Sequence, residues 1–531
     1  MKVLEKEIRK RRTFGIVSHP DAGKTTLTEK LLLFGGAIHQ AGAVKSNKIR
    51  KGATSDFMEI ERQRGISVAT SVLAFHYKDK KINILDTPGH KDFAEDTYRT
   101  LTAVDSVIVV IDGAKGVEEQ TKKLVEVCRM RSVPMIVFIN KMDRNALDPF
   151  DLFDQLEDQL KLNPTPITFP IGDGLDFKGI YHILKDNMLL YSSNDKQHLP
   201  IYHSIDIADS KQVTEAIGVP SFEQLKENIE VVDELYPKFD IRKYLDGKIH
   251  PIIFGSALKN FGVQELLDIL VEIAPHPKPQ ISENREVRPN ENNFSGFVFK
   301  IHANMDPKHR DRLAFLKIVS GTFVRNTPYY HVRLNKKLKF SSPNAFFAEK
   351  RQVVETSYPG DIVGLHDTGN FKIGDTLTDG EKLIFKGIPS FSPEHFRYVI
   401  NKNPLKTKQL KKGIDQLMDE GVAQLFRLQI NGRQIIGTVG ILQFEVIQYR
   451  LLHEYGAECS YEALPVYKAC WIDQNNQHKE FDEFLRLKQK FLAIDKSEQL
   501  VFLADSKFTL SHTLQKFPSI KFHFQSEFNA N

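Results

Sequence analysis

A short polar segment, SHPDAGKTT (18–26), follows the apolar run FGIV (14–17) and has the composition of a phosphate-binding loop. In such a loop, successive backbone N–H groups and the start of a helix present partial positive charge to phosphate oxygens. Lys24 would bridge the β- and γ-phosphates of a nucleotide, and the Thr25 hydroxyl would coordinate Mg²⁺. Ser18 stands where the G-x-x-x-x-G-K-[ST] pattern has glycine, and serine is tolerated there if its φ angle is negative. The residues predicted to contact the phosphates are Ser18, His19, Pro20, Asp21, Ala22, Gly23, Lys24 and Thr25.

A second polar segment, DTPGH (86–90), follows the apolar run INIL (82–85). A carboxylate at the C-terminal end of a strand beside the phosphate loop is placed to hold the water shell of a metal ion, which assigns Asp86 to Mg²⁺. Gly89 would offer its N–H to the γ-phosphate, and His90 would orient an attacking water, as a general base or as an electrostatic stabiliser. The alternative for His90 is a surface histidine that opens a helix. The predicted nucleotide contacts here are Asp86, Thr87, Pro88, Gly89 and His90, with His90 as the catalytic residue.

Two further segments carry residues that recognise a base. The Asp143 carboxylate in NKMD (140–143) can accept from guanine N1–H and N2–H₂ together, and adenine offers no such pair of donors. Lys141 would lay its alkyl stem on the base, and Asn140 would tie the loops together. In GSAL (255–258) the Ala257 N–H would meet guanine O6. The predicted base-side residues are Asn140, Lys141, Met142, Asp143, Ser256 and Ala257.

The order of these segments strengthens the hypothesis of a nucleotide site. All four follow predicted strands, at the edge where ligands of open α/β sheets bind. Between the first two lies DFMEIERQRGISV (56–68), whose charged residues suit a switch that becomes ordered only around a γ-phosphate. Ser67 in this segment is the second hydroxyl predicted to coordinate Mg²⁺, beside Thr25 and Asp86. The alternative is an ordinary exposed helix and loop.

The length of the chain and the pattern of its apolar runs predict several domains, the first of which must position these residues. At 531 residues, three or four domains are expected. Short apolar runs alternate with helical patterns over 13–145, which favours a mostly parallel, helix-covered sheet with an antiparallel hairpin at 71–86 on its edge. The predicted units are a nucleotide-binding α/β domain (1–275) with a polar insertion of few long periodic segments (about 165–250), a linker (276–293), a β-barrel domain (294–385) and an α+β domain of split β-α-β type (386–531).

Composition narrows the cellular setting. The three cysteines, Cys128, Cys459 and Cys470, have no C-x-x-C spacing, so a disulfide framework or a zinc site is not expected. The N-terminal residues are charged throughout, and no run of apolar residues is long enough to span a bilayer. The net charge of +5 permits an anionic partner such as RNA without requiring one. We expect a cytoplasmic monomer with no membrane partner.

The segments SHPDAGKTT, RGIS, DTPGHKDF, NKMD and GSAL resemble the guanine-nucleotide signatures of translational GTPases. Members of that group carry histidine after D-x-P-G, and many have alanine, serine or glycine at the Ser18 position. Elongation factor G shares the insertion and the barrel, but its chain continues through two further domains. Longer stretches, among them DFAEDTYRTLTAVDSVIVVIDGAKGVE, YPGDIVGLHDTGNFKIGDT and VGILQFEVIQYRL, resemble the bacterial class II peptide chain release factors over nearly the whole length.

This resemblance implies a ribosome-stimulated GTPase that binds GTP or GDP with Mg²⁺. Such a factor binds the ribosome after peptide release and uses GTP to eject the class I release factor that is still bound there. The barrel and the C-terminal domain would contact the ribosome, and ribosomal RNA would position His90. Two alternatives are another translational GTPase, such as an elongation or ribosome-rescue factor, and a P-loop kinase or ATPase. The guanine-specific NKMD segment counts against the kinase or ATPase.

Overall fold

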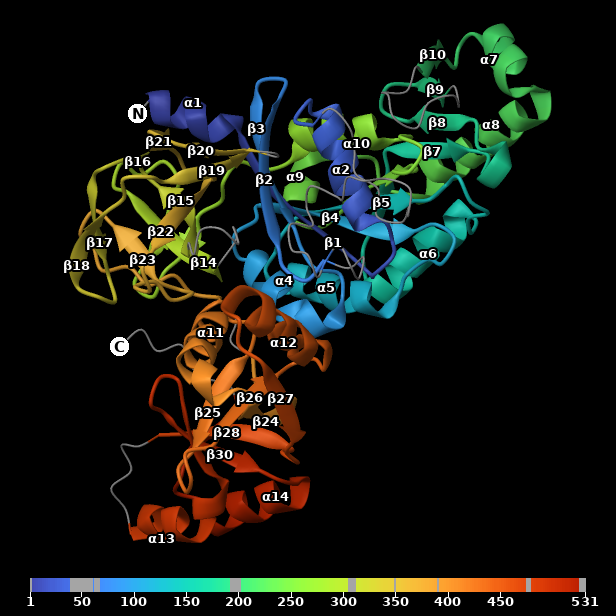
Figure 1. The fold of residues 1–531 in the computed structure, drawn as a ribbon. Helices are drawn as coiled ribbons and strands as arrows, with labels where there is room; N and C mark the ends of the chain where they lie inside the picture. The colour runs from blue at the N-terminus through green and yellow to red at the C-terminus, as the bar shows by residue number, and fades with distance from the viewer. Residues whose placement is uncertain are drawn as a thin grey trace.

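The computed structural model describes residues 2–38, 61, 67–191, 202–303, 312–347, 350–388, 391–473 and 479–524. Most of the predicted switch segment 56–68 therefore lies outside the described residues. The ribbon has an α/β domain with an outlying insertion, a β-barrel beside it, and a C-terminal domain below both (Figure 1). This arrangement confirms the predicted fold class. No helix in the described ranges is long and apolar enough to cross a membrane.

One sheet forms the centre of the N-terminal domain. Its strands run in the order β2-β3-β1-β4-β5-β11-β6, and all these neighbours are parallel except β2 and β3, which form the predicted antiparallel hairpin. The hairpin is not a free edge, because β2 also pairs with β19 (Asn344–Phe347) of the next domain. Every residue of β1, β4, β5 and β11 is buried, because helices cover both faces of the sheet. The strands are β1 (Arg11–Ser18), β2 (Ser71–Tyr77), β3 (Lys80–Asp86), β4 (Ser106–Asp112), β5 (Met135–Asn140), β6 (Pro164–Pro166) and β11 (His250–Phe254).

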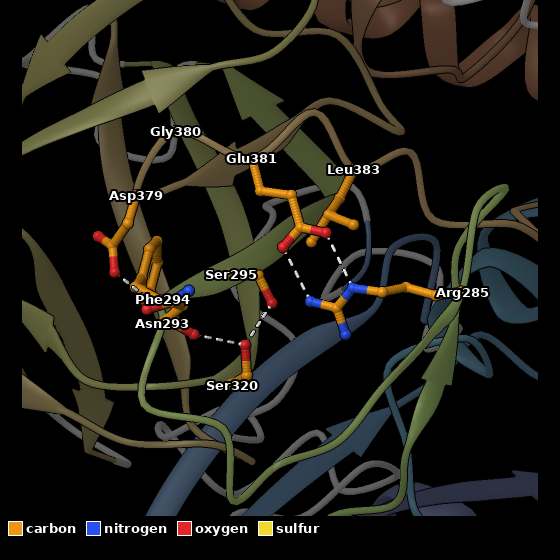
Figure 2. Close-up of a pocket in the computed structure, with 9 residues that line it drawn as sticks. All are labelled: Arg285, Asn293, Phe294, Ser295, Ser320, Asp379, Gly380, Glu381 and Leu383. Carbon is orange, nitrogen blue, oxygen red and sulfur yellow. Dashed lines mark hydrogen bonds and ion pairs between the residues drawn. The ribbon is translucent and has the colours of Figure 1, made fainter.

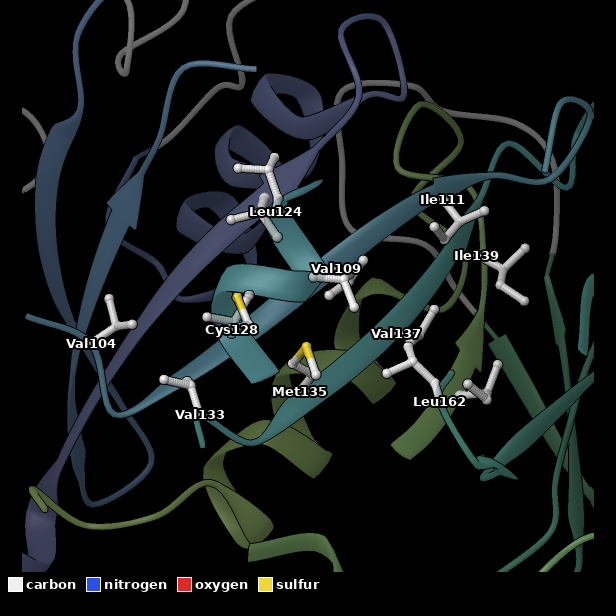
Figure 3. Close-up of a cluster of buried hydrophobic side chains, with 14 of the residues drawn as sticks. Val104, Val109, Ile111, Leu124, Cys128, Val133, Met135, Val137, Ile139 and Leu162 are labelled. Atoms are coloured by element: carbon white, nitrogen blue, oxygen red, sulfur yellow. The ribbon is translucent and has the colours of Figure 1, made fainter. Parts of the chain in front are cut away.

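The helices of this domain pack on the two faces of the sheet. They are α1 (Lys2–Lys10), α2 (Lys24–Phe34), α4 (Ala94–Thr100), α5 (Glu119–Met130), α6 (Pro149–Leu160) and α10 (Val263–Ile273), with the 3₁₀ turn η1 (Lys91–Phe93). Side chains alternate between faces along each strand. On one face, Val109 and Val137 pack with Leu124 and Cys128 of α5 (Figure 3). On the other face, alternate residues of the same strands pack with α2 and α10: Ile108, Val110, Ile136, Phe138, Leu27, Leu31, Leu266 and Leu270.

The insertion is more regular than its sequence indicates. It contains a four-stranded antiparallel sheet and a 17-residue helix, α8 (Val219–Leu235). The periodic signal of α8 is weak because its buried side chains are confined to Phe222, Leu225 and Val232. The other elements are β7 (Thr168–Ile171), η2 (Gly174–Asp176), β8 (Gly179–His182), β9 (Asn187–Tyr191), β10 (Tyr202–Asp206), α7 (Ser210–Ile217) and α9 (Ile241–Leu245).

The second domain is built from short antiparallel strands around its own apolar core, which includes Val298, Leu316, Val363 and Leu377. Its linker pairs β12 (Gln280–Ile281) with β13 (Glu286–Val287). The strands are β14 (Ser295–Ala303), β15 (Arg312–Ser320), β16 (Phe323–Val324), β17 (Pro328–His331), β18 (Lys336–Lys339), β19 (Asn344–Phe347), β20 (Lys350–Val353), β21 (Thr356–Ser357), β22 (Ile362–Asp367) and β23 (Thr376–Thr378).

The C-terminal domain follows the predicted split β-α-β pattern and then extends it. The first half runs β24 (His395–Asn401), η3 (Pro404–Lys406), α11 (Thr407–Asp419), β25 (Gln424–Leu428), β26 (Gln434–Thr438), α12 (Leu442–Tyr455) and β27 (Cys459–Ala463). The same sheet continues into a second half with a separate core. Its elements are β28 (Lys468–Ile472), α13 (Lys479–Lys488), η4 (Gln489–Phe491), β29 (Leu492–Asp495), β30 (Leu500–Ala504), α14 (Lys507–Lys516) and β31 (Phe522–His523).

The short helix α4 lies where the three domains meet. The Asp96 carboxylate accepts from the Thr70 backbone N–H at 2.6 Å and pairs with Lys300 of the barrel at 2.7 Å. The Arg99 guanidinium donates to the Gly421 carbonyl of the C-terminal domain at 3.0 Å and pairs with Glu95 at 3.1 Å. One helix of the nucleotide-binding domain is therefore bonded to both following domains.

Other joints between domains also contain buried ion pairs. Asp361 of the barrel contacts Arg11 at 2.8 Å and Lys81 at 2.9 Å. Burial alone would raise the pKa of Asp361, but these two cations lower it to about 2. At the joint between the barrel and the C-terminal domain, Glu420 accepts from the Ala303 N–H of the barrel at 2.7 Å and pairs with Arg450 of its own domain at 2.6 Å. Removal of one partner from such a buried pair typically destabilises a protein by about 3–5 kcal/mol.

The buried Glu95 predicts a pH-dependent stability. Burial raises the pKa of Glu95 from 4.5 to about 7, although Arg99 opposes this shift. The folded protein then retains a proton that the unfolded chain releases near pH 4.5, so stability falls as pH rises from about 4.5 to 7 and stays lower above that. The variant Glu95→Gln should remove up to about 3 kcal/mol of this decline. Urea unfolding at pH 5.5 and pH 8 measures it, with the exposed Glu223→Gln as control. An unchanged pH dependence in Glu95→Gln would contradict this assignment.

Candidate nucleotide site

The phosphate loop is held between β1, which ends at Ser18, and α2, which begins at Lys24. Gly23 has φ +99°, and a Cβ atom there would lie 2.2 Å from the Asn140 amide nitrogen. Glycine is therefore required both by conformation and by the close approach of a second loop. Asp21 also adopts a left-handed conformation, with φ +66°.

Serine can replace glycine at position 18 only if its φ angle is negative, and Ser18 meets this condition. Among the described residues it does not belong to those with positive φ, so its Cβ introduces no backbone strain. Its hydroxyl donates to the His19 carbonyl at 2.8 Å. The next backbone N–H, that of His19, donates to the Thr121 hydroxyl of α5 at 3.1 Å. Serine at this position is thus compatible with a tight loop.

The residues predicted to hold Mg²⁺ come together at the start of α2. The Lys24 ammonium lies 2.5 Å from Asp86 Oδ1, and both side chains are buried. The Thr25 and Ser67 hydroxyls are 3.4 Å apart. Asp86 Oδ2 is buried and has no hydrogen-bond partner among the described residues. Two hydroxyls and an unsatisfied carboxylate oxygen are the hard oxygen ligands that suit Mg²⁺ and its water shell, so these residues fit the ion.

His90 precedes the 3₁₀ turn η1 and caps it. Its Nδ1 accepts from the Asp92 backbone N–H at 3.2 Å, and about a third of its side chain is exposed. The Asp92 carboxylate in turn accepts from the Leu442 N–H, at the start of α12, at 2.7 Å. Phe93 packs with Val68 and Val446 in a small apolar cluster. The segment that carries His90 is therefore anchored to the C-terminal domain.

The loops on the base side are tied together by Asn140. Its Nδ2 donates to the Ala22 carbonyl at 2.8 Å, and its Oδ1 accepts from the Ala257 N–H at 2.9 Å. This is the linking role that the sequence predicts for Asn140. The Ala257 N–H is also the donor that the sequence assigns to guanine O6. A bound guanine would have to share this donor with Asn140, and its contact with Ala257 stays a prediction.

Asp143 and Lys141 are oriented by neighbouring polar groups. The Ser256 hydroxyl donates to Asp143 Oδ1 at 2.5 Å, which leaves Oδ2 and the remaining lone pairs of Oδ1 for a base. Lys141 adopts φ +70°, and its ammonium contacts the Asp21 carbonyl at 2.6 Å and Asp112 Oδ2 at 2.5 Å. Ser256 therefore acts here as a support for Asp143.

Two residues of this region were not identified from the sequence. Asp112 ends β4 as Asp86 ends β3, and this repeated position, a carboxylate closing an apolar strand, is the signal that could have identified it. Asp92 gave no such signal, because its partner lies 350 residues away in the chain. The binding roles of the predicted residues stay predictions, while their proximity is a property of the fold.

A pocket of about 260 Å³ lies away from these loops, between the linker and the barrel (Figure 2). Arg285 of the linker pairs there with Glu381 at 2.8 Å and with Glu291 at 2.9 Å. The Ser295 and Ser320 hydroxyls bond each other at 2.6 Å, and the Phe294 N–H donates to Asp379 at 2.6 Å. These polar groups bond one another, and the ion pairs of Arg285 hold the linker against the barrel. We therefore assign the nucleotide to the loops described above and not to this pocket.

Comparison with known families matches the three parts of the chain in order. Residues 9–276 match the Elongation factor Tu GTP binding domain, residues 293–380 match Elongation factor G domain 2, and residues 385–514 match the Class II release factor RF3, C-terminal domain. A crystal structure of a protein from Thermus thermophilus superposes with a TM-score of 0.70 at 20% sequence identity. That match covers 88% of this chain and 71% of the other, and it shows the shared fold alone.

The carboxylate of Asp143 should decide which base is bound. In Asp143→Asn, the carboxylate that pairs with two guanine donors is replaced by an amide that suits the extra carbonyl of xanthine. We expect GTP to bind about 10- to 100-fold more weakly, and xanthosine triphosphate to bind more tightly, as fluorescence titration would measure. The control is Asp151→Asn on the exposed surface of α6. Unchanged GTP affinity, or tight binding of ATP by the wild-type protein, would refute guanine recognition by Asp143.

Proposed function

We propose that this chain, which belongs to the translational GTPases of the class II release factor type, ejects class I release factors from the ribosome after peptide release. The observation that carries the proposal is the match of residues 385–514 to the C-terminal domain of class II release factors, behind a GTP-binding domain and a barrel. This combination favours termination over elongation or ribosome rescue. The proposal places the protein in the cytoplasm, acting on ribosomes as a monomer.

GTP would occupy the loops described above. Lys24 and the backbone N–H groups of the phosphate loop would hold the β- and γ-phosphates, and Asp143 would select guanine. Thr25 and Ser67 would coordinate Mg²⁺ directly, and Asp86 through water. When bound, the ion supplies positive charge that stabilises the charge developing on the phosphate oxygens.

The hydrogen bonds of His90 favour one of its two proposed roles. With Nδ1 accepting from the Asp92 N–H, a neutral imidazole would carry its proton on Nε2, whereas an imidazolium would direct its Nδ1–H toward Asp92 Oδ1 at 3.5 Å. In both forms Nε2 donates a hydrogen bond and accepts no proton. His90 would therefore orient the attacking water, or stabilise the developing negative charge, without acting as a general base from that atom.

The contacts of α4 and η1 supply the route by which hydrolysis would act on the rest of the protein. Asp92 bonds the start of α12, Asp96 bonds Lys300 of the barrel, and Arg99 bonds the Gly421 carbonyl. A movement of this segment after loss of the γ-phosphate would change contacts with both following domains. Such coupling is what a factor needs in order to convert GTP cleavage into a movement on the ribosome.

His90→Ala should separate binding from hydrolysis. We expect the affinity for GTP to stay within about twofold, because the His90 side chain is assigned to the attacking water, while other predicted contacts hold the phosphates. Ribosome-stimulated turnover should fall about 10²- to 10⁴-fold, the contribution typical of a residue that positions or transfers a proton. Phosphate release is measured with and without ribosomes, and His203→Ala, on the exposed strand β10, is the control. Full ribosome-stimulated turnover in His90→Ala would show that His90 has no catalytic role.

The cellular role is tested on terminated ribosomes that carry a labelled class I release factor. The full-length protein with GTP should accelerate dissociation of that factor, while the protein with no nucleotide, and His90→Ala with GTP, should show slower multiple-turnover recycling. If dissociation is not accelerated while GTP hydrolysis is still stimulated by ribosomes, the release-factor role is wrong and the GTPase assignment stands.

A further inference from the structure

The segment that leads into α11 presents a concentrated positive charge. Between Asn401 and Ile414 the sequence NKNPLKTKQLKKGI contains five lysines and no aspartate or glutamate. The whole chain of 531 residues has a net charge of only +5, so this is a local excess. All five side chains are exposed, and we name them together the α11 lysine surface: Lys402, Lys406, Lys408, Lys411 and Lys412.

Most of these charges are not neutralised within the protein. Lys402 contacts Glu458 at 3.3 Å, an exposed pair of little strength. In the described ranges the other four lysines have no ion-pair contact within 4 Å, although Lys411 interacts electrostatically with Asp415 one turn further along α11. Lys408 and Lys412 are four positions apart on one helix and repel each other. Repulsion between these lysines costs free energy in the isolated protein, and the binding of an anionic partner would reduce that repulsion.

The lysines stand on a rigid support. The opposite side of α11 is buried against α12 through Leu410, Ile414 and Leu417. In the segment before the helix, Asn403 Oδ1 accepts from the Leu405 N–H at 3.1 Å, and Asn401 Nδ2 donates to the Thr407 hydroxyl at 2.9 Å. The backbone that carries the charges is therefore fixed before any partner arrives.

Charge is segregated along α11. The carboxylates at its C-terminal end are used inside the protein, where Asp419 contacts Arg312 of the barrel at 2.7 Å and Lys496 at 2.5 Å. The helix lies at the end of the C-terminal domain that adjoins the barrel (Figure 1). Its acidic end closes a joint between domains, and its basic end faces solvent.

We infer that the α11 lysine surface binds the phosphate backbone of RNA. Lysine is a compact charge on a flexible stem, which suits phosphate groups whose positions vary. Lysine is depleted in protein–protein interfaces, which are enriched in arginine and aromatic residues, and this surface contains neither. The two asparagines that would be able to read base edges already bond the segment itself. Recognition is therefore electrostatic and independent of base sequence.

Leu405 adds an apolar contact to this surface. Its side chain is 91% exposed and lies between Lys402 and Lys406 in the chain. Since the inference rests on the proposed function, the RNA concerned is ribosomal, and the surface would guide and hold the C-terminal domain during ribosome binding.

The test neutralises four charges in the full-length protein: Lys406, Lys408, Lys411 and Lys412 are each replaced by glutamine. The matched control replaces four exposed lysines of the nucleotide-binding domain and its insertion, namely Lys161, Lys185, Lys211 and Lys243, by glutamine, which gives the same net charge. Two probes are used, a 24-base-pair RNA duplex and ribosomes, each titrated at several salt concentrations. GTP affinity is measured in parallel to check the nucleotide-binding domain, and thermal unfolding followed by circular dichroism to check that the C-terminal domain of the α11 variant is folded.

For the α11 variant we expect at least about tenfold weaker binding to the duplex and to ribosomes. The slope of log K against log salt should fall by about 3, since each phosphate contact contributes about 0.7–0.9. The control variant should lose much less affinity for either probe. Turnover of GTP at saturating ribosomes should be unchanged in both.

The outcomes separate this inference from the proposed function. Weaker ribosome binding with unchanged duplex binding would indicate an acidic protein partner and overturn the RNA assignment. Equal losses of affinity in the two variants would mean that only the net charge of the protein matters, and this result would also overturn the RNA assignment. If the wild-type protein bound the duplex through these lysines but did not bind ribosomes, the proposed function would fail while the RNA-binding surface stood.

Discussion

Charges buried at the joints between domains must remain paired, and this constraint fixes how the three domains sit together. Asp96 with Lys300, and Asp361 with Arg11 and Lys81, lie where water is largely excluded. Glu420, which pairs with Arg450 of its own domain, accepts from the Ala303 N–H of the barrel. Sliding one domain along the next would leave each charge buried without its partner, so the joints favour a few discrete arrangements over continuous sliding. The site and the domains that follow it are thereby coupled: η1 and α4 carry Asp92, Asp96 and Arg99, and each of these residues bonds a different part of the chain.

The nucleotide loops are held by the same principle on a smaller scale. Asn140 bonds both the phosphate loop and the GSAL loop, Ser256 holds Asp143, and Asp112 holds Lys141. Few of these side chains are left to find their positions when a ligand arrives, which lowers the entropic cost of binding. The exception is the edge beside Asp86, where a buried carboxylate oxygen has no protein partner among the described residues. That edge is where the proposed Mg²⁺ and its waters would bind.

The sequence predicted the α/β domain, its edge hairpin, the barrel and the split β-α-β pattern, because each depends on local periodicity and turn residues. It also predicted that Asn140 would tie the loops together. It underestimated the insertion, since α8 buries only a narrow set of side chains and gives a weak periodic signal. It did not indicate that the Ala257 N–H, whose contact with guanine O6 stays a prediction, also bonds Asn140, because which donor reaches which acceptor depends on how two loops approach each other.

The sequence by itself determined the kinds of groups available at the site: a lysine and hydroxyl after a tight turn, carboxylates at strand ends, and an aspartate, proposed to read the base, after a buried strand. These are local patterns, and strand order brings their ends to one edge. Only the tertiary structure decided which groups are already engaged and which face a ligand. Asp92 meets Leu442 across 350 residues and Arg99 meets Gly421 across 322, and no local pattern encodes such contacts. They depend on the path of the whole chain, because a hydrogen bond needs its two atoms within about 3 Å.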